Sequence, residues 1–241
     1  MTERGGRHCE RTADRFVIGP SGLVWDGSRL VISVAERSTP FLQPVKGTIT
    51  VDVSDLGMVA HALSDTGGHH WRPMNPSVAV EVDFDAPALS WRGRGYLDMN
   101  WGNEGLEQGF RFWDWSRFDL GGGQSAVLYR TDPRIGDGRQ LAFRFDGKGG
   151  VERFESVDTP GLAPTRIWRI RRPAMAAASD AGTGAVRLVR TFEDTPFYSR
   201  SEVAADLFGR ASPGVHESYD GNRLKRGVVK AMLPFRMPRV G

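Results

Sequence analysis

Short alternating or apolar segments, separated by Gly, Pro, Asp or Asn, recur along almost the whole chain, while helical periodicity is scarce. Alternating runs of this length are typical of β-strands, and closely spaced turn residues favour antiparallel connections. The 30 Gly and 14 Pro among the 241 residues fit such a turn-rich protein. The sequence therefore predicts an all-β fold, in which antiparallel strands close into barrels or sandwiches.

The predicted strands fall into two groups that meet near Ala86-Pro87. The first group covers residues 15–18, 22–25, 30–35 and 48–53. The second group is more regular and covers residues 88–100, 109–120, 125–130, 140–146, 151–157, 166–171, 185–192 and 214–218. Eight successive strands are what a small up-and-down barrel requires. We therefore predict two domains, residues 1–86 and 87–241, with one short helix over residues 201–208.

Composition and the absence of certain motifs argue against several classes of function. No apolar run approaches the roughly 18 residues of a transmembrane helix, and the N-terminus has no apolar signal-peptide region. Cys9 is the single cysteine, which excludes an internal disulfide and fits a reducing, cytoplasmic compartment. A phosphate-binding Gly-rich loop, a dinucleotide fingerprint and a nucleophile elbow are all missing from the sequence, which disfavours phosphoryl transfer and nicotinamide chemistry.

The net charge of +3 is unevenly spread, because no acidic residue follows Asp220. Apolar residues alternate there with six basic ones: Arg223, Lys225, Arg226, Lys230, Arg236 and Arg239. A basic, apolar tail can rest on an anionic membrane surface, or it can be a solvated end packed on its own barrel. Both interpretations stay open. No recognition motif accompanies the charge, so nucleic acid is not an expected partner.

The densest aromatic segment, residues 95–118, contains one carboxylic acid of particular interest, Asp98. Strand alternation places Tyr96, Asp98 and Asn100 on one face. A carboxyl group facing aromatic side chains loses water, which favours its neutral, proton-donating form. Such a group could protonate a carbon–carbon double bond. The alternative is a carboxylate that caps a turn or pairs with an arginine such as Arg94 or Arg117.

The pair His69 and His70 precedes Trp71. Neighbouring strand residues point to opposite faces, so these two histidines do not share one metal ion, and no further ligand stands at metal-binding spacing. One histidine beside Trp71 suits water binding or proton handling, with a purely structural histidine as the alternative. Aromatic side chains that could line a site for a long apolar ligand, or simply fill the core, are Trp101, Phe112, Trp113 and Trp115.

Seven segments together resemble the carotenoid 1,2-hydratase family, also called hydroxyneurosporene synthase. They are Met1-Thr-Glu-Arg-Gly, Ile18-Gly-Pro-Ser, Tyr96-Leu-Asp-Met-Asn-Trp-Gly-Asn-Glu-Gly-Leu-Glu, Phe112-Trp-Asp-Trp-Ser-Arg, Thr195-Pro-Phe-Tyr-Ser-Arg, Val215-His-Glu-Ser and Met232-Leu-Pro-Phe-Arg-Met-Pro-Arg. The resemblance implies two lipocalin-like β domains. It also implies cofactor-free addition of water to the terminal double bond of an acyclic carotenoid, such as lycopene or neurosporene.

The family's proposed chemical residues, a His-x-Trp pair and a Tyr-x-Asp pair, fall here on His69 and Trp71 and on Tyr96 and Asp98. The resemblance thus implies that Asp98 donates a proton, Tyr96 orients it, Trp71 shields the cation and His69 handles the water. Family members usually begin well before the segment that opens this chain, so an incomplete first domain with an open sheet edge is expected.

Two other classes of function remain open at this point: a lipocalin-like carrier that binds a carotenoid unchanged, and an isoprenoid cyclase or pericyclase on the same scaffold. Because a carotenoid is too apolar to travel through water, the substrate would come from a bilayer. We therefore expect a cytoplasmic protein that lies peripherally on the inner membrane.

Overall fold

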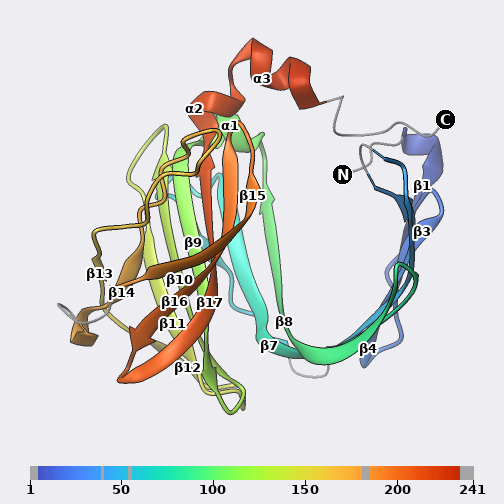
Figure 1. The fold of residues 1–241 in the computed structure, drawn as a ribbon, viewed down its shortest axis with the longest axis horizontal. Helices are drawn as coiled ribbons and strands as arrows, with labels where there is room; N and C mark the ends of the chain where they lie inside the picture. The colour runs from blue at the N-terminus through green and yellow to red at the C-terminus, as the bar shows by residue number, and fades with distance from the viewer. Residues whose placement is uncertain (1–4, 39–40, 54–55, 181–184, 234–241) are drawn as a thin grey trace. The chain divides into compact units, whose positions relative to one another are not determined.

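The computed structural model describes residues 5–38, 41–53, 56–180 and 185–233. Antiparallel β-strands dominate it (Figure 1), which confirms the all-β prediction. The chain forms two compact units. The first comprises residues 1–56, 77–97 and 230–241, and the second comprises residues 57–76 and 98–229.

This division does not fall at residue 86, because two long strands each contribute residues to both units. They are β7 (His69–Ala86) and β8 (Ala88–Gly102), joined through a cis Ala86–Pro87 peptide. The beginning of β7 pairs with β6 (His61–Ala62), whereas its last third pairs with β5 (Pro44–Asp52). A strand that changes neighbours along its length links the two units through the chain.

The first unit is an antiparallel meander in the order β1-β2-β3-β4-β5-β7, with β8 paired to β7. Its other elements are η1 (Gly6–His8), β1 (Cys9–Arg11), β2 (Arg15–Ile18), β3 (Ser21–Trp25) and β4 (Arg29–Arg37). Alternate residues of β4 and β5 turn to one face and pack with β7 and β8. The resulting core consists of Val51, Val53 and Val78, with Leu30, Ile32, Ile49, Leu56, Val80 and Leu97 partly buried around it.

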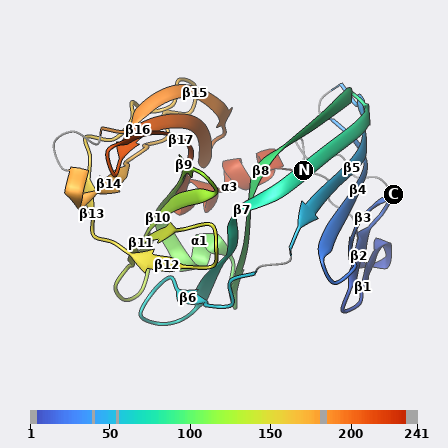
Figure 2. The same cartoon turned by 90° about the horizontal axis from the view of Figure 1, so that it is seen from below.

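The second unit is built on a seven-stranded antiparallel sheet in the order β12-β11-β10-β9-β17-β16-β15. Its strands are β9 (Phe110–Gly121), β10 (Gln124–Pro133), β11 (Gln140–Phe145), β12 (Val151–Arg153), β15 (Arg187–Asp194), β16 (Tyr198–Leu207) and β17 (Arg210–Asp220). The late strand β17, red in Figure 1, lies beside the green strand β9. Figure 2 looks along these strands and shows the sheet curling upon itself.

Two sequence predictions are wrong in this unit. A helix was predicted over residues 201–208, but residues 201–207 belong to strand β16, along which buried residues alternate with a period of two. Residues 166–171 form no strand: the Asp194 carboxylate accepts the backbone N–H groups of Ile167 and Trp168, which are therefore not available to a sheet ladder. Further along the chain, β14 (Met175–Ala177) pairs with β13 (Ser156–Asp158) and is followed by η2 (Ala178–Asp180).

The seven-stranded sheet has two faces of different character, set by strand alternation and cross-strand register. One face, here called the core face, packs Phe118, Leu120, Ala126, Leu128, Ala142, Val203, Ala205 and Leu207 with the small residues of β14. The opposite face, here called the aromatic face, carries Trp113, Trp115, Tyr129, Phe143, Tyr198 and Tyr219. The candidate site lies on the aromatic face.

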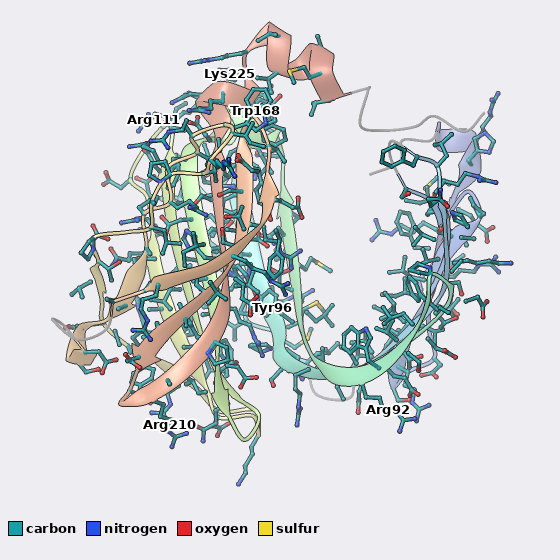
Figure 3. All side chains as sticks on the ribbon, viewed as in Figure 1. Arg92, Tyr96, Arg111, Trp168, Arg210 and Lys225 are labelled. Atoms are coloured by element: carbon teal, nitrogen blue, oxygen red, sulfur yellow. The ribbon has the colours of Figure 1, made fainter. Side chains whose placement is uncertain are left out.

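Three short helices complete the described chain: α1 (Leu106–Gly109), α2 (Gly221–Leu224) and α3 (Gly227–Met232). The Asp220 carboxylate caps α2 by accepting the N–H of Arg223. Of the basic tail, Lys225 (labelled in Figure 3), Arg226 and Lys230 are exposed, while Arg236 and Arg239 lie outside the described residues. In the part of the chain that the structure describes, no helix is long and apolar enough to cross a membrane.

Candidate functional site

The first residues of β7 place one tryptophan against the aromatic face. Trp71 is fully buried, and the edge of its ring meets Tyr129 at a centroid distance of 5.4 Å. Phe143 lies 6.2 Å from the same ring, and His61 of the paired strand β6 lies 5.8 Å from it. The register of β6 and β7 and the apolar surroundings therefore fix the direction of the indole N–H.

That indole N–H donates to Asp98. The Trp71 Nε1 atom lies 3.0 Å from Oδ2 of Asp98, and Nδ2 of Asn100 donates to the same oxygen over 3.1 Å. The Asp98 residue is half-buried, and Asn100 stands two residues along the same strand, as alternation requires. Two N–H donors on one oxygen orient the carboxyl group.

Arg94 and Arg117, the alternative partners predicted for Asp98, each donate a hydrogen bond to a backbone carbonyl group of β7. Arg94 donates to the carbonyl oxygen of Ser77 over 2.8 Å, and Arg117 donates to that of Pro76 over 2.9 Å. Each guanidinium thus secures the strand that carries Trp71.

His69 lies on the same side of β7 as Trp71 and is buried in a tight space formed by glycines. A Cβ atom on Gly102 would lie 2.3 Å from its Nδ1 atom, and one on Gly109 would lie 2.5 Å from Nε2. The ring contacts Phe110 at 4.8 Å, and Nε2 lies 3.8 Å from the Glu104 carboxylate. Burial lowers the pKa of His69 and so favours its neutral ring, although the charge of Glu104 opposes this effect. Among the described residues Nε2 accepts or donates no hydrogen bond.

His70 points the other way and stacks on Trp101 at 5.3 Å. Trp101 is 42% exposed, and the Arg72 guanidinium lies over its ring. The structure therefore places Trp101 away from the aromatic face. Phe112 also lies elsewhere, on the core face of β9, where Arg171 stacks on it.

Trp113 and Trp115 do lie on the aromatic face, against which Trp71 packs. Trp113 meets the Tyr129 ring at 5.9 Å, and Trp115 stands directly opposite Tyr129 on the paired strand. Tyr96, labelled in Figure 3, is half-buried on β8, two residues before Asp98. Its residue range belongs to the first unit. Of the residues predicted from the sequence, the structure thus places Trp113 and Trp115 on the aromatic face and Trp71 against it, and Asp98 accepts the indole N–H of Trp71.

Sequence reasoning missed two groups on this face, Tyr129 and Glu217. Burial raises the pKa of the Tyr129 phenol, and the charges of Asp98 and Glu217 raise it further. Burial also raises the pKa of the Glu217 carboxyl, against the lowering effect of Arg200. Alternation could have assigned each group to a face of its own strand, but only the strand pairing shows that they share a sheet face with Trp113 and Trp115.

The core face holds a separate set of buried polar groups. His216 lies between two hydroxyl groups, with Nδ1 2.8 Å from Ser116 and Nε2 3.0 Å from Ser218. Beside it, the Asp114 carboxylate accepts from Arg130 over 2.8 Å, and burial raises its pKa to about 7 although Arg130 lowers it. These groups lie in the interior of the second unit, on the sheet face opposite to Trp113 and Trp115. Over the described ranges, no three His, Cys, Asp or Glu side chains are arranged to hold a metal ion.

Fold and site together define a lipocalin-like β protein in which a half-buried carboxyl group accepts the N–H of an indole that packs against an aromatic sheet face. A solved structure from Nitrosomonas europaea, titled an AttH, supports the fold alone: its TM-score is 0.54 at 12% identity, and the match covers 89% of this chain and 72% of that one. The chain belongs to the carotenoid hydratase CrtC family, whose model matches residues 1–241.

Curated relatives agree with this membership. The acyclic carotenoid 1,2-hydratase of Thiocapsa roseopersicina is 44% identical over 241 residues, and that of Rubrivivax gelatinosus is 40% identical over 239 residues. The matches cover 100% and 99% of this chain but 58% of each relative. The enzyme of the same name from Cereibacter sphaeroides is 35% identical, with 99% of this chain and 84% of the relative covered. The chain therefore spans little more than half the length of the first two relatives.

Proposed function

We propose that this chain adds water to the terminal carbon–carbon double bond of an acyclic carotenoid, a hydro-lyase reaction of carotenoid biosynthesis. Membership of the carotenoid hydratase family and the names of three relatives support the substrate class. The carrying observation is the placement of Asp98, whose Oδ2 accepts the indole N–H of Trp71, a residue that packs against Tyr129 of the aromatic face.

In the proposed reaction, the protonated Asp98 carboxyl gives its proton to the less substituted carbon of the terminal double bond. The π electrons form the new C–H bond, and the adjoining carbon becomes a tertiary cation. The oxygen of a water molecule then adds to that carbon, and the loss of one water proton leaves a tertiary alcohol. The Trp71 and Asn100 N–H groups face the oxygen of Asp98 on which negative charge develops, so they stabilise the transition state.

This geometry supports a positioning role for Trp71. Its N–H is bound to Asp98 and its ring is fully buried beside Tyr129 and Phe143. We propose that Trp113 and Trp115 provide ring surface toward the cation instead. Tyr96 orients the Asp98 carboxyl in this proposal. His69 takes the proton released by the added water, because a neutral imidazole can accept one.

The test is product analysis after incubation of the purified chain with lycopene or neurosporene in detergent micelles. The proposal predicts a product heavier by the mass of one water. A bound but unaltered carotenoid would instead indicate a carrier. A new compound of unchanged mass would indicate a cyclase or pericyclase. Because the chain spans 58% of two relatives, the same incubation with the Thiocapsa roseopersicina enzyme serves as the positive control.

We further propose that the basic tail brings the protein to a bilayer that supplies the substrate. The exposed side chains of Lys225, Arg226 and Lys230 support this, because clustered cations attract anionic lipid. Reversing these three charges to Glu should reduce sedimentation with anionic liposomes. Reversal of the exposed Arg139, Lys148 and Arg153 changes the net charge equally and should have no such effect. Equal sedimentation of both triple variants would refute the tail's role.

A further inference from the structure

Loop 165–170, which precedes β14 in the second unit, is closed by hydrogen bonds at its base. The Thr165 N–H donates to the carbonyl oxygen of Ile170 over 3.1 Å, and the Ile170 N–H donates to Oγ1 of Thr165 over 2.9 Å. Both residues are buried. The base of the loop is therefore fixed in the interior of the second unit.

The tip of the loop is held by two side chains from other elements. The Asp194 carboxylate at the end of β15 accepts the N–H of Ile167 over 2.7 Å and that of Trp168 over 3.2 Å. From α2, the Arg223 guanidinium donates to the carbonyl oxygens of Trp168 and Arg169. The backbone of the tip is thus bonded on both sides, and the conformation of the loop is set before it meets any partner.

This preformed tip keeps a large aliphatic side chain in water. Ile167 is 72% exposed, and Val228 on the neighbouring helix α3 is 67% exposed. The bonds from Arg223 join the loop to the segment that carries α3, and Figure 3 labels Trp168 and Lys225 at this end of the second unit. An isoleucine held in water forgoes the stabilisation that burial would give it, so a partner that covers Ile167 gains that free energy.

Exposed cations accompany these aliphatic side chains in the loop and in the segment between α2 and α3. They are Arg166, Arg169, Lys225 and Arg226. The carboxylates that contact the loop and α2 are already engaged, since Asp194 accepts backbone N–H groups and Asp220 accepts the N–H of Arg223. Aliphatic side chains among cations match the chemistry of an anionic bilayer, in which apolar chains lie beneath negatively charged phosphate groups.

We propose that loop 165–170 is a membrane anchor, which inserts Ile167 between the lipids of an anionic bilayer while Arg166 and Arg169 bind headgroup phosphates. The proposal rests on the proposed function, in which the substrate comes from a bilayer. The basic tail alone would bind by charge, which salt screens, whereas Ile167 adds an apolar contribution. Because the loop is held in one conformation, insertion costs little conformational entropy.

The first experiment reports the surroundings of Ile167 directly. Ile167→Cys in a Cys9→Ser background is labelled with nitrobenzoxadiazole, whose emission should shift to shorter wavelength when phosphatidylglycerol–phosphatidylcholine vesicles are added. The same label on Val151→Cys is the control, because Val151 is 57% exposed on β12, at the opposite end of the sheet from α2 (Figure 1), and should show no shift. Vesicle binding without a shift at residue 167, or no vesicle binding at all, would overturn the proposal.

The second experiment measures how much Ile167 contributes to binding. Ile167→Gln should weaken cosedimentation with the same vesicles by about tenfold or more, because an inserted aliphatic side chain is lost. Val151→Gln makes a comparable exchange at the other end of the sheet and should bind like wild type. Equal affinities of the two variants would overturn the proposal.

Neither experiment needs substrate, so the anchor and the proposed hydration can fail separately. Ile167→Gln should hydrate a carotenoid in detergent micelles at the wild-type rate and a carotenoid dissolved in vesicles more slowly. A matching loss of rate in micelles would show that Ile167 supports the fold instead, and would count against the anchor. If wild type gives no hydrated product, the proposed function fails, while vesicle binding still decides the role of the loop.

Discussion

Replacing Trp71 with phenylalanine removes the indole N–H that donates to Asp98 and keeps an aromatic ring between Tyr129 and Phe143. The lost bond spans 3.0 Å and ends on a carboxyl oxygen that becomes negative when Asp98 gives up its proton. Hydrogen bonds to charged groups contribute about 1.5–3 kcal/mol. Since each 1.4 kcal/mol changes a rate about tenfold, Trp71→Phe should hydrate the carotenoid about 10- to 150-fold more slowly.

The same substitution also leaves a small cavity, because Trp71 is fully buried. A large-to-small change of this size lowers the free energy of unfolding by about 1–2 kcal/mol, which urea denaturation measures. Single-turnover hydration, followed by product separation, measures the rate of the folded variant. Trp25→Phe is the control: Trp25 is 46% exposed on β3, so both its rate and its stability should match wild type.

A double-mutant cycle with Asp98→Ala, which removes the accepting oxygen, tests the bond itself. If the indole N–H is bonded to the Asp98 carboxyl group, the changes in unfolding free energy of the two single variants should fail to add by about 1 kcal/mol. Full additivity, together with a wild-type rate in Trp71→Phe, would refute the positioning role of Trp71.

Two predictions concern the buried histidines. Burial, reinforced by Arg172 and Arg130, lowers the pKa of His216 to about 3, below its unfolded value near 6.5, so its contribution to stability is complete above pH 6.5 and is lost as pH falls toward 3. The glutamine side chain of His216→Gln does not titrate. The free energy of unfolding of this variant should therefore fall by about 3 kcal/mol less than that of wild type between pH 7 and pH 4. Urea denaturation at both pH values measures this difference, and an unchanged pH dependence would contradict the prediction. Gly102→Ala places a Cβ atom 2.3 Å from Nδ1 of His69, so it should lower the free energy of unfolding by about 1–3 kcal/mol and slow hydration. Gly227→Ala is the control: no atom lies within 4 Å of the added Cβ, so neither effect is expected. Equal melting temperatures of these two variants would show that the space around His69 is not tight.

Period-two alternation predicted much of the fold because each strand buries one face. The strand predicted over residues 15–18 is β2 itself, and the predictions for residues 109–120 and 140–146 each differ from β9 and β11 by a residue at their ends. The prediction failed where local preference and tertiary pairing disagree. Residues 201–208 contain Ala and Leu that favour a helix, yet small buried residues such as Ser201 let β16 pack in the sheet.

The site was predictable only where its parts are close in sequence. The positions of Asp98 and Asn100 on one face followed from alternation along β8. The bond between Trp71 and Asp98 depends on residues 27 positions apart, and Tyr129 and Glu217 arrive from strands still further along the chain. Strand register decides these contacts, and no local residue pattern encodes it.

The most direct test of the account follows hydration in D₂O with wild type and Asp98→Asn side by side. The side-chain acid exchanges its proton with solvent, so wild type should form a hydrated carotenoid with one non-exchangeable deuterium on the carbon beside the new C–OH. Asp98→Asn should fold normally, since an amide still accepts the Trp71 N–H, and should form no such product. A deuterated alcohol formed by Asp98→Asn at the wild-type rate would show that the proton comes from another group.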